Sequence, residues 1–230
     1  MNLKKTISLI LILTVILIIS LYGFYGIVND ESNLKSNELG SVDVIGPIGN
    51  TSSNVKIAYI VGVHPLESVV HDELVETLKS KSDSLNYCYY IYKINVTDNP
   101  QDYEIGRMNG QLLANEYVVS DIINKDYNLV VDIHSNQGLN GGSYEKTNFV
   151  FSPSLNDSKS VEINDEILNS SPHLDYYFPE SQTSPQYVTL PIIESGTPAI
   201  IYETYMYESR DITHDYINKL IIAIDSLKKI

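Results

Sequence analysis

Apolar and polar positions along this chain form blocks that predict strands and helices in alternation. Short apolar runs, typical of buried strands, cover residues 55–61, 86–96, 129–134, 148–151 and 198–204. Apolar residues at helical spacing cover residues 68–79, 102–124, 159–168 and 211–227. Strands that alternate with helices predict an α/β fold. We expect three layers, in which a mainly parallel, mixed central sheet is flanked by helices on both faces.

The first 28 residues carry a different pattern. Lys4 and Lys5 precede an uncharged, apolar run over residues 7–28, which is close to the ~20 residues that a helix needs to cross a bilayer. The run is longer than the core of a typical signal peptide, and no small-x-small cleavage site follows it. Because the lysines lie on its N-terminal side, the rest of the chain is expected outside the cytoplasm. We predict a single-pass anchor in the cell membrane over residues 1–28, with a cleaved signal peptide as the alternative.

Two further parts follow the predicted anchor. Residues 29–54 are rich in Ser, Asn and Gly and show no periodicity, which predicts a flexible linker. Residues 55–230 have the length of one compact domain with a full core, and we predict that this domain is catalytic.

Charge and cysteine content exclude several classes of partner and site. All 29 acidic residues but only 13 of the 15 basic residues follow residue 28, so this part has a formal charge of 13 − 29 = −16. A strongly acidic surface argues against binding to nucleic acid. The single cysteine, Cys88, excludes an internal disulfide and a thiolate metal cluster, and its apolar neighbours predict a buried residue.

The segment His64-Pro65-Leu66-Glu67 is the strongest candidate for chemistry. His64 and Glu67 lie three residues apart where a predicted strand gives way to a helix, and Pro65 restricts the connecting turn. His134 ends another predicted strand and can supply a third ligand. Three nitrogen or oxygen ligands with an open fourth position are typical of catalytic zinc. A salt bridge between His64 and Glu67 at a helix N-terminus is the simpler alternative.

Two other residues lie close to these candidates in sequence. Asp132 precedes His134 by two positions and is a possible hydrogen-bond partner for an imidazole. His71 lies one helical turn beyond Glu67, and we predict a histidine on the helix surface, with a supporting contact to a ligand residue as the alternative.

Metal-assisted hydrolysis also needs a general base. Glu203 is the best candidate, because it ends the apolar strand at 198–204 and burial of an acid there is costly without a purpose. Glu194 is a rival, but it precedes Ser195-Gly196, which predicts a solvent-exposed turn. Since the working residues of parallel sheets gather at the carboxyl ends of strands, Glu203 is expected beside His64 and His134.

A cation is needed to hold the developing oxyanion. The chain has two arginines, Arg107 and Arg210. Arg107 follows Asn99-Pro100 and begins the long predicted helix, so we expect its side chain to face the same crevice.

The order of these motifs resembles the zinc carboxypeptidase superfamily, including its succinylglutamate desuccinylase and aspartoacylase branch. The resemblance rests on Gly62-x-His64-x-x-Glu67, Asp132-Ile-His134-Ser135 and Ile201-Tyr-Glu203. It implies a carboxypeptidase-like fold with one zinc ion bound by His64, Glu67 and His134, and with Glu203 as the general base. The Asn99-Pro100 … Arg107 segment resembles the stretch whose arginine polarises the scissile carbonyl.

One departure from the family pattern affects the substrate. The family's Asn-Arg pair, which grips a substrate carboxylate, should follow shortly after Arg107. The sequence there is Gln111-Leu-Leu-Ala-Asn-Glu, without an arginine. Recognition of a free C-terminal carboxylate is therefore not implied.

These observations predict a membrane-anchored, extracytoplasmic, zinc-dependent amidohydrolase or peptidase. Its expected substrate is a peptide or an N-acyl amino acid, with a cell-wall peptide as one candidate, and its other expected partner is the lipid bilayer, through residues 7–28. The alternative is a surface binding protein that keeps the same fold without catalysis.

Overall fold

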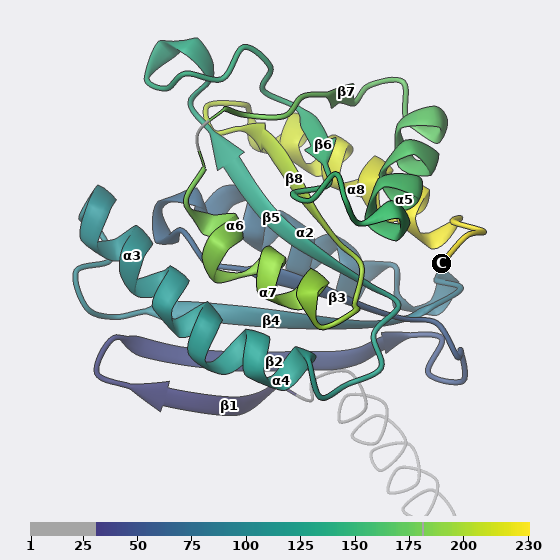
Figure 1. Cartoon of the computed structure of the whole chain (residues 1–230), viewed down its shortest axis with the longest axis horizontal. Coiled ribbons are helices and arrows are strands. Elements are labelled where there is room, and N and C mark those ends of the chain that lie inside the picture. Colours follow the sequence, from purple (N-terminus) through teal and green to yellow (C-terminus); the bar gives the residue numbers. More distant parts are fainter. Residues whose placement is uncertain (1–30, 181) are drawn as a thin grey trace, which may run out of the picture.

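The computed structural model describes residues 31–180 and 182–230. Eight strands in this part of the chain form one mixed sheet, in the order β1-β2-β4-β3-β5-β8-β6-β7 (Figure 1). The strands are β1 (Glu31–Asn37), β2 (Gly40–Gly49), β3 (Lys56–Val61), β4 (Cys88–Val96), β5 (Leu129–Asn136), β6 (Phe149–Phe151), β7 (Asp175–Tyr176) and β8 (Ala199–Tyr205).

The centre of the sheet is parallel and its margins are partly antiparallel. Strands β4, β3, β5 and β8 pair in parallel. At one margin β2 pairs antiparallel with both β4 and β1, and at the other β6 pairs antiparallel with β8. The expected α/β fold with a mixed sheet is confirmed. Because the four central strands run in the same direction, their carboxyl ends lie along one edge, where ligands usually bind in such sheets.

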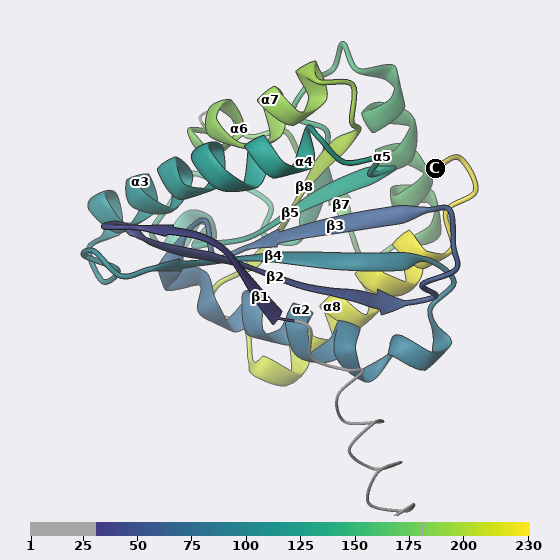
Figure 2. The same ribbon diagram turned by 90° about the horizontal axis from the view of Figure 1, so that it is seen from below.

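Helices cover both faces of the sheet and make the fold three-layered. Figure 2 shows α2 and α8 on one face, with α3, α6 and α7 on the other. The helices are η1 (Pro65–Glu67), α2 (Ser68–Ser80), η2 (Ser82–Ser84), α3 (Tyr103–Leu113), η3 (Ala114–Val119), α4 (Ser120–Ile122), η4 (Gly138–Asn140), α5 (Ser158–Ser170), α6 (Ser184–Tyr187), α7 (Thr189–Glu194) and α8 (Arg210–Asp225).

Each face of the sheet packs into its own apolar cluster, because successive side chains of a strand point to opposite faces. In β3, Ile57 and Tyr59 pack with apolar residues of α2, α5 and α8. Ala58 and Ile60 pack with residues of α3, η3, α4 and α7 on the other face. Burial on both faces explains why the central strands are apolar runs without alternation.

The flexible linker predicted over residues 29–54 is wrong for the described part of that range. Residues 31–49 form β1 and β2, and β2 pairs with the full length of β4. Val42, Val44 and Ile45 are buried in the apolar clusters. The alternation is hidden in the sequence because the register shifts between Ile45 and Ile48, where Gly46-Pro47 interrupts the pairing.

The long helix predicted over residues 102–124 is confirmed as a continuous helical run through α3, η3 and α4, which includes one π-helical segment. Its first half buries a different face from the one that the apolar spacing suggested. Ile105, Met108 and Leu112 are 48%, 40% and 41% exposed. The buried face there contains Gly106 and Gly110 instead, since glycines allow the helix to lie against neighbouring backbone.

The predicted membrane anchor lies outside the described residues. Within residues 31–180 and 182–230, no helix has the length and apolar character needed to cross a membrane.

Candidate functional site

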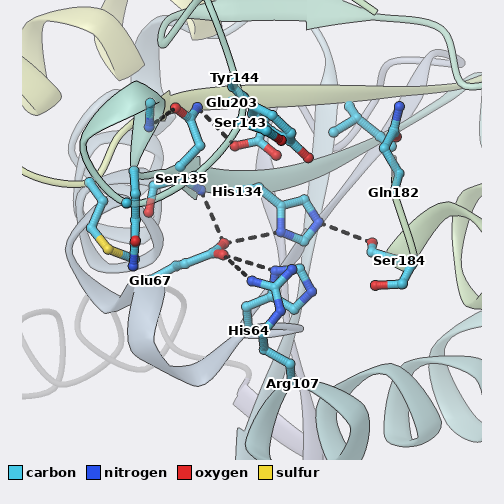
Figure 3. Close-up of a pocket in the computed structure, with 18 of the residues that line it drawn as sticks. His64, Glu67, Arg107, His134, Ser135, Ser143, Tyr144, Gln182, Ser184 and Glu203 are labelled. Atoms are coloured by element: carbon cyan, nitrogen blue, oxygen red, sulfur yellow. Dashed lines mark hydrogen bonds and ion pairs between the residues drawn. The ribbon is translucent and has the colours of Figure 1, made fainter. Parts of the chain in front are cut away.

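Three buried side chains converge at the carboxyl edge of the central strands. The Nδ1 of His64 lies 2.9 Å from Oε1 of Glu67, and the Nδ1 of His134 lies 3.1 Å from Oε2 of the same carboxylate (Figure 3). One ligand atom of each residue lies within 4.8 Å of the other two. All three residues are less than 5% exposed. Two imidazole nitrogens and a carboxylate oxygen in a compact group are a donor set that suits zinc.

Local backbone geometry brings His64 to this place. After β3 the chain turns at Gly62, whose φ is +87°. A side chain there would overlap the backbone carbonyl of Ile94, so the turn requires glycine. His64 then caps the short helix η1, and the backbone N–H of Glu67 donates to the carbonyl of His64 at 3.1 Å. This tight turn, begun by Pro65, places both side chains on the same side.

The second nitrogen of each histidine also has a neighbour. The Nε2 of His134 lies 2.9 Å from Oδ2 of Asp132, which also accepts a hydrogen bond from Ser184 at 3.3 Å. The Nε2 of His64 lies 3.2 Å from the side-chain amide of Gln111. Histidines that bind metals usually have their other ring nitrogen held in this way. The structure therefore gives Asp132 the supporting position that the sequence suggested.

Charges in this group depend on one another. Burial opposes ionisation of Glu67, but the charge of His64 and hydrogen bonds from His134 and His64 hold the pKa of Glu67 well below its usual range. Burial likewise opposes protonation of His134, but Asp132 and Glu67 raise its pKa well above the ordinary value. Burial lowers the pKa of His64 to about 4. The group thus holds an anionic carboxylate between two imidazoles, a state in which a metal ion can replace a proton.

Glu203 and Arg107 lie around the same group. Glu203 is in β8, directly opposite His134 in the register with β5, and its Oε2 accepts a hydrogen bond from Nδ2 of Asn136 at 3.1 Å. Burial raises the pKa of Glu203 to about 8, and the negative charge of Glu67 adds to this effect. Arg107, in α3, donates from a terminal guanidinium nitrogen to Oε1 of Glu67 at 3.2 Å.

A cavity of about 330 Å³ opens beside these residues. Its walls come from the loop after β5, the start of α3 and the segment that leads into α6. Figure 3 shows Glu203, Tyr144 and Ser143 on one side, with Gln182 and Ser184 on another. Ligand-sized cavities with a few convergent polar groups are typical of binding sites.

No protein-family model and no curated protein matches this sequence. Several solved structures are similar to the structure of this chain. A metallo-carboxypeptidase from Burkholderia cenocepacia aligns with a TM-score of 0.55 at 13% identity, over 88% of this chain and 66% of that one. A metallo-carboxypeptidase from Pseudomonas aeruginosa aligns with a TM-score of 0.54 at 11% identity, over 85% and 62% of the two chains.

This chain has the metallo-carboxypeptidase fold. The cell shape determinant protein Csd4 from Helicobacter pylori is also similar, with a TM-score of 0.53 at 12% identity, over 80% of this chain and 54% of that one. The chain spans less than two thirds of the length of each of these three proteins. The carboxypeptidase-like fold expected from the motifs is thus confirmed, and the particular branch stays a prediction.

On this metallo-carboxypeptidase fold, all five predicted site residues meet at one cavity. His64, Glu67, Arg107, His134 and Glu203 all line it. The rival acid Glu194 is exposed at the end of α7 and does not line it.

The prediction for His71 was wrong. It is 6% exposed, and its Nε2 lies 3.0 Å from the backbone carbonyl of Ile133. His71 lies on the face of helix α2 that packs against β5, so its side chain is shielded from solvent.

Several polar residues of the site carry no signal in the sequence. Gln111, Tyr144 and Ser184 lie in a helix, a loop and a short helix that are far apart along the chain. Only the packing of α3 and α6 beside β5 brings Gln111 and Ser184 to the histidines. A glutamine within a helix or a serine before a proline predicts no such role.

Proposed function

We propose that this protein is a metal-dependent hydrolase that cleaves an amide bond in a peptide or an N-acyl amino acid. The observation that carries the proposal is the buried group of His64, Glu67 and His134, which opens onto a cavity that also contains Glu203 and Arg107. His64, Glu67 and His134 would hold one zinc ion. Bound there, zinc would act as a Lewis acid towards a carbonyl and lower the pKa of a water molecule to about 7.

Glu203 supplies the proton transfers in this mechanism. Its carboxylate is buried at the cavity wall, and a pKa of about 8 lies close to physiological pH, where a general base works best. Glu203 takes a proton from the attacking water and gives it to the leaving nitrogen. The hydrogen bond from Asn136 orients its carboxylate.

Arg107 supplies the positive charge for the oxyanion. Its guanidinium lies 5.0 Å from the centroid of the Tyr103 ring, and one nitrogen contacts Glu67. These two contacts fix the guanidinium at the cavity, while its other N–H groups can donate to the oxygen on which negative charge develops.

Peptides are the best-supported substrate class. The Csd4 structure, which shares this fold, holds a tripeptide. We further propose, from the sequence, that residues 7–28 anchor the protein with its catalytic domain outside the cytoplasm. The support is the position of Lys4 and Lys5 before the apolar run. Retention of the protein in carbonate-washed membranes would test the anchor, and release into the wash would refute it.

Metal content and activity of the full-length protein test the proposed function. We expect about one zinc ion per chain in the wild type, and loss of zinc in His64→Ala. Glu203→Gln should keep zinc and lose hydrolysis of N-acetylated peptides by at least about 100-fold, the usual contribution of general acid–base catalysis. Glu194→Gln, the same substitution at an exposed site, is the control and should retain activity. Wild-type protein without zinc would instead favour the inactive binding protein.

A further inference from the structure

The charges around the cavity are unevenly distributed. Its described lining residues include two carboxylates, Glu67 and Glu203, and one permanent cation, Arg107. Apart from the imidazoles of His64 and His134, the other polar side chains of the wall are hydroxyls and amides. They include Gln137, Ser143, Gln182 and Thr183.

Arg107 is already engaged. Its guanidinium contacts Glu67 at 3.2 Å and lies over the ring of Tyr103, and in the proposed mechanism its remaining donors serve the scissile carbonyl. With those donors committed to the scissile carbonyl, Arg107 does not also form the paired hydrogen bonds by which an arginine usually grips a substrate carboxylate.

None of the described lysines lines the cavity. Lys146 is the closest to it in sequence, two residues from Tyr144 in the loop after β5. Its ammonium pairs with Asp175 at 3.2 Å on the surface, where both side chains are half exposed. The chain's other arginine, Arg210, pairs with Glu76 on α2, away from the cavity.

A substrate carboxylate bound away from the proposed metal site would therefore have no cationic partner among the described residues. Burying an anion in that part of the wall without a cation is costly, and the charge of −16 on the residues after position 28 opposes its approach. Uncharged amides and hydroxyls meet neither penalty, because the amide and hydroxyl side chains of the wall can exchange hydrogen bonds with them. The chemistry of the wall thus selects against a free chain end.

We propose that the substrate presents an uncharged peptide segment to this cavity, such as an interior stretch of peptide or an amide-blocked end, and not a free terminal carboxylate. The proposal rests on the proposed function and adds the substrate class to it. It predicts cleavage within a peptide or next to a blocked terminus.

Matched peptide probes test the substrate class. Each of a panel of N-acetylated tripeptides is prepared as the free acid and as the C-terminal amide. Their dissociation constants are measured by calorimetry with zinc-loaded Glu203→Gln full-length protein, and kcat/KM is measured with the wild type. We expect the amide of each pair to bind at least about tenfold more tightly and to be cleaved preferentially. Acids that bind as tightly as amides or more tightly, or a panel in which no amide binds, would overturn the proposal.

A variant that introduces a positive charge makes the test sharper. Gln182 lines the cavity, so Gln182→Arg introduces a second cation there. It should shift the acid-to-amide preference towards the acid by about tenfold, and Gln182→Met, of similar size and without charge, should leave the preference unchanged. If neither variant changes the ratio, or both change it equally, charge at the wall does not select the substrate.

These outcomes separate the two proposals. Zinc-free protein, or zinc-loaded protein that cleaves no probe, refutes the hydrolase. The binding ratio of acid to amide still reports the substrate class in the second case, because it needs no turnover.

Discussion

Substitution of Gly110 by alanine tests whether the close approach of α3 to the strand end maintains the site. A Cβ at Gly110 would overlap the carbonyl oxygen of Val63 and lie 2.9 Å from its carbonyl carbon, where ordinary contact begins at 3.4 Å. Because the oxygen is the closer of the two atoms, the helix and the Val63 backbone must separate by at least about 1 Å. Val63 directly precedes His64, and Arg107 lies one helical turn before Gly110, so both sides of the candidate site are affected.

The expected loss follows from these distances. A displacement of about 1 Å along the contact between Arg107 and Glu67 lengthens it from 3.2 Å to about 4.2 Å, which is too long for a hydrogen bond. Loss of a hydrogen bond to a charged group costs about 1.5–3 kcal/mol, and overpacking costs about 1–3 kcal/mol. Alanine regains about 1 kcal/mol of helix propensity. We expect a net loss of about 1.5–5 kcal/mol in the free energy of unfolding.

Thermal denaturation of the full-length protein measures this effect. For a domain of this size each 1 kcal/mol lowers the melting temperature by roughly 2–4 °C, so Gly110→Ala should melt at least about 3 °C below the wild type. Met108→Ala is the matched control, because Met108 is 40% exposed on the same helix, and it should remain within about 0.5 kcal/mol. If Gly110→Ala melts at or above the wild-type temperature, α3 can move away without cost and the argument fails.

Two further predictions concern buried polar groups. Burial lowers the pKa of His71 below 6.5, so the unfolded chain takes up a proton at this residue at a higher pH than the folded chain does. The free energy of unfolding should therefore fall as the pH drops below 6.5. In urea titrations over this pH range His71→Gln should show a shallower fall than the wild type, and an equal slope would refute the prediction. Asp225 accepts hydrogen bonds from Asn86, Tyr87 and Tyr89, so Asp225→Ala should lose at least about 3 kcal/mol in the same titrations. Asp215→Ala, at an exposed ion pair, is its control, and equal losses would contradict the assignment.

The order of the candidate ligand residues along the chain was predictable because it depends on local patterns. His64 and His134 follow apolar runs whose burial in a parallel sheet could be inferred from their lack of alternation. Glu203 ends another such run, opposite His134. Since parallel strands end along one edge, three sequence segments could be assigned to one site before their contacts were known.

Two predictions, the flexible linker before β3 and the buried face of α3, failed for physical reasons. Residues 31–49 have an interrupted register, and the pairing of β1 with β2 and of β2 with β4 joins segments far apart in the chain, so it leaves no clear local pattern. In α3 the apolar spacing of Ile105, Met108 and Leu112 indicated the wrong face. The helix buries Gly106 and Gly110 instead, and contact between glycine and backbone adds nothing to a hydrophobic pattern.

The sequence alone determined which side chains could form a metal site, because the spacing of His64 and Glu67 and the strand-end positions of His134 and Glu203 are local properties of the chain. Only the tertiary structure decided what surrounds them. It turned Gln111 towards His64 and Ser184 towards Asp132, and it left the cavity wall with Arg107 as the single permanent cation among its described residues. Those contacts join residues about 50 positions apart, and such distant pairs are selected by packing and charge in the folded chain rather than by any periodicity in the sequence.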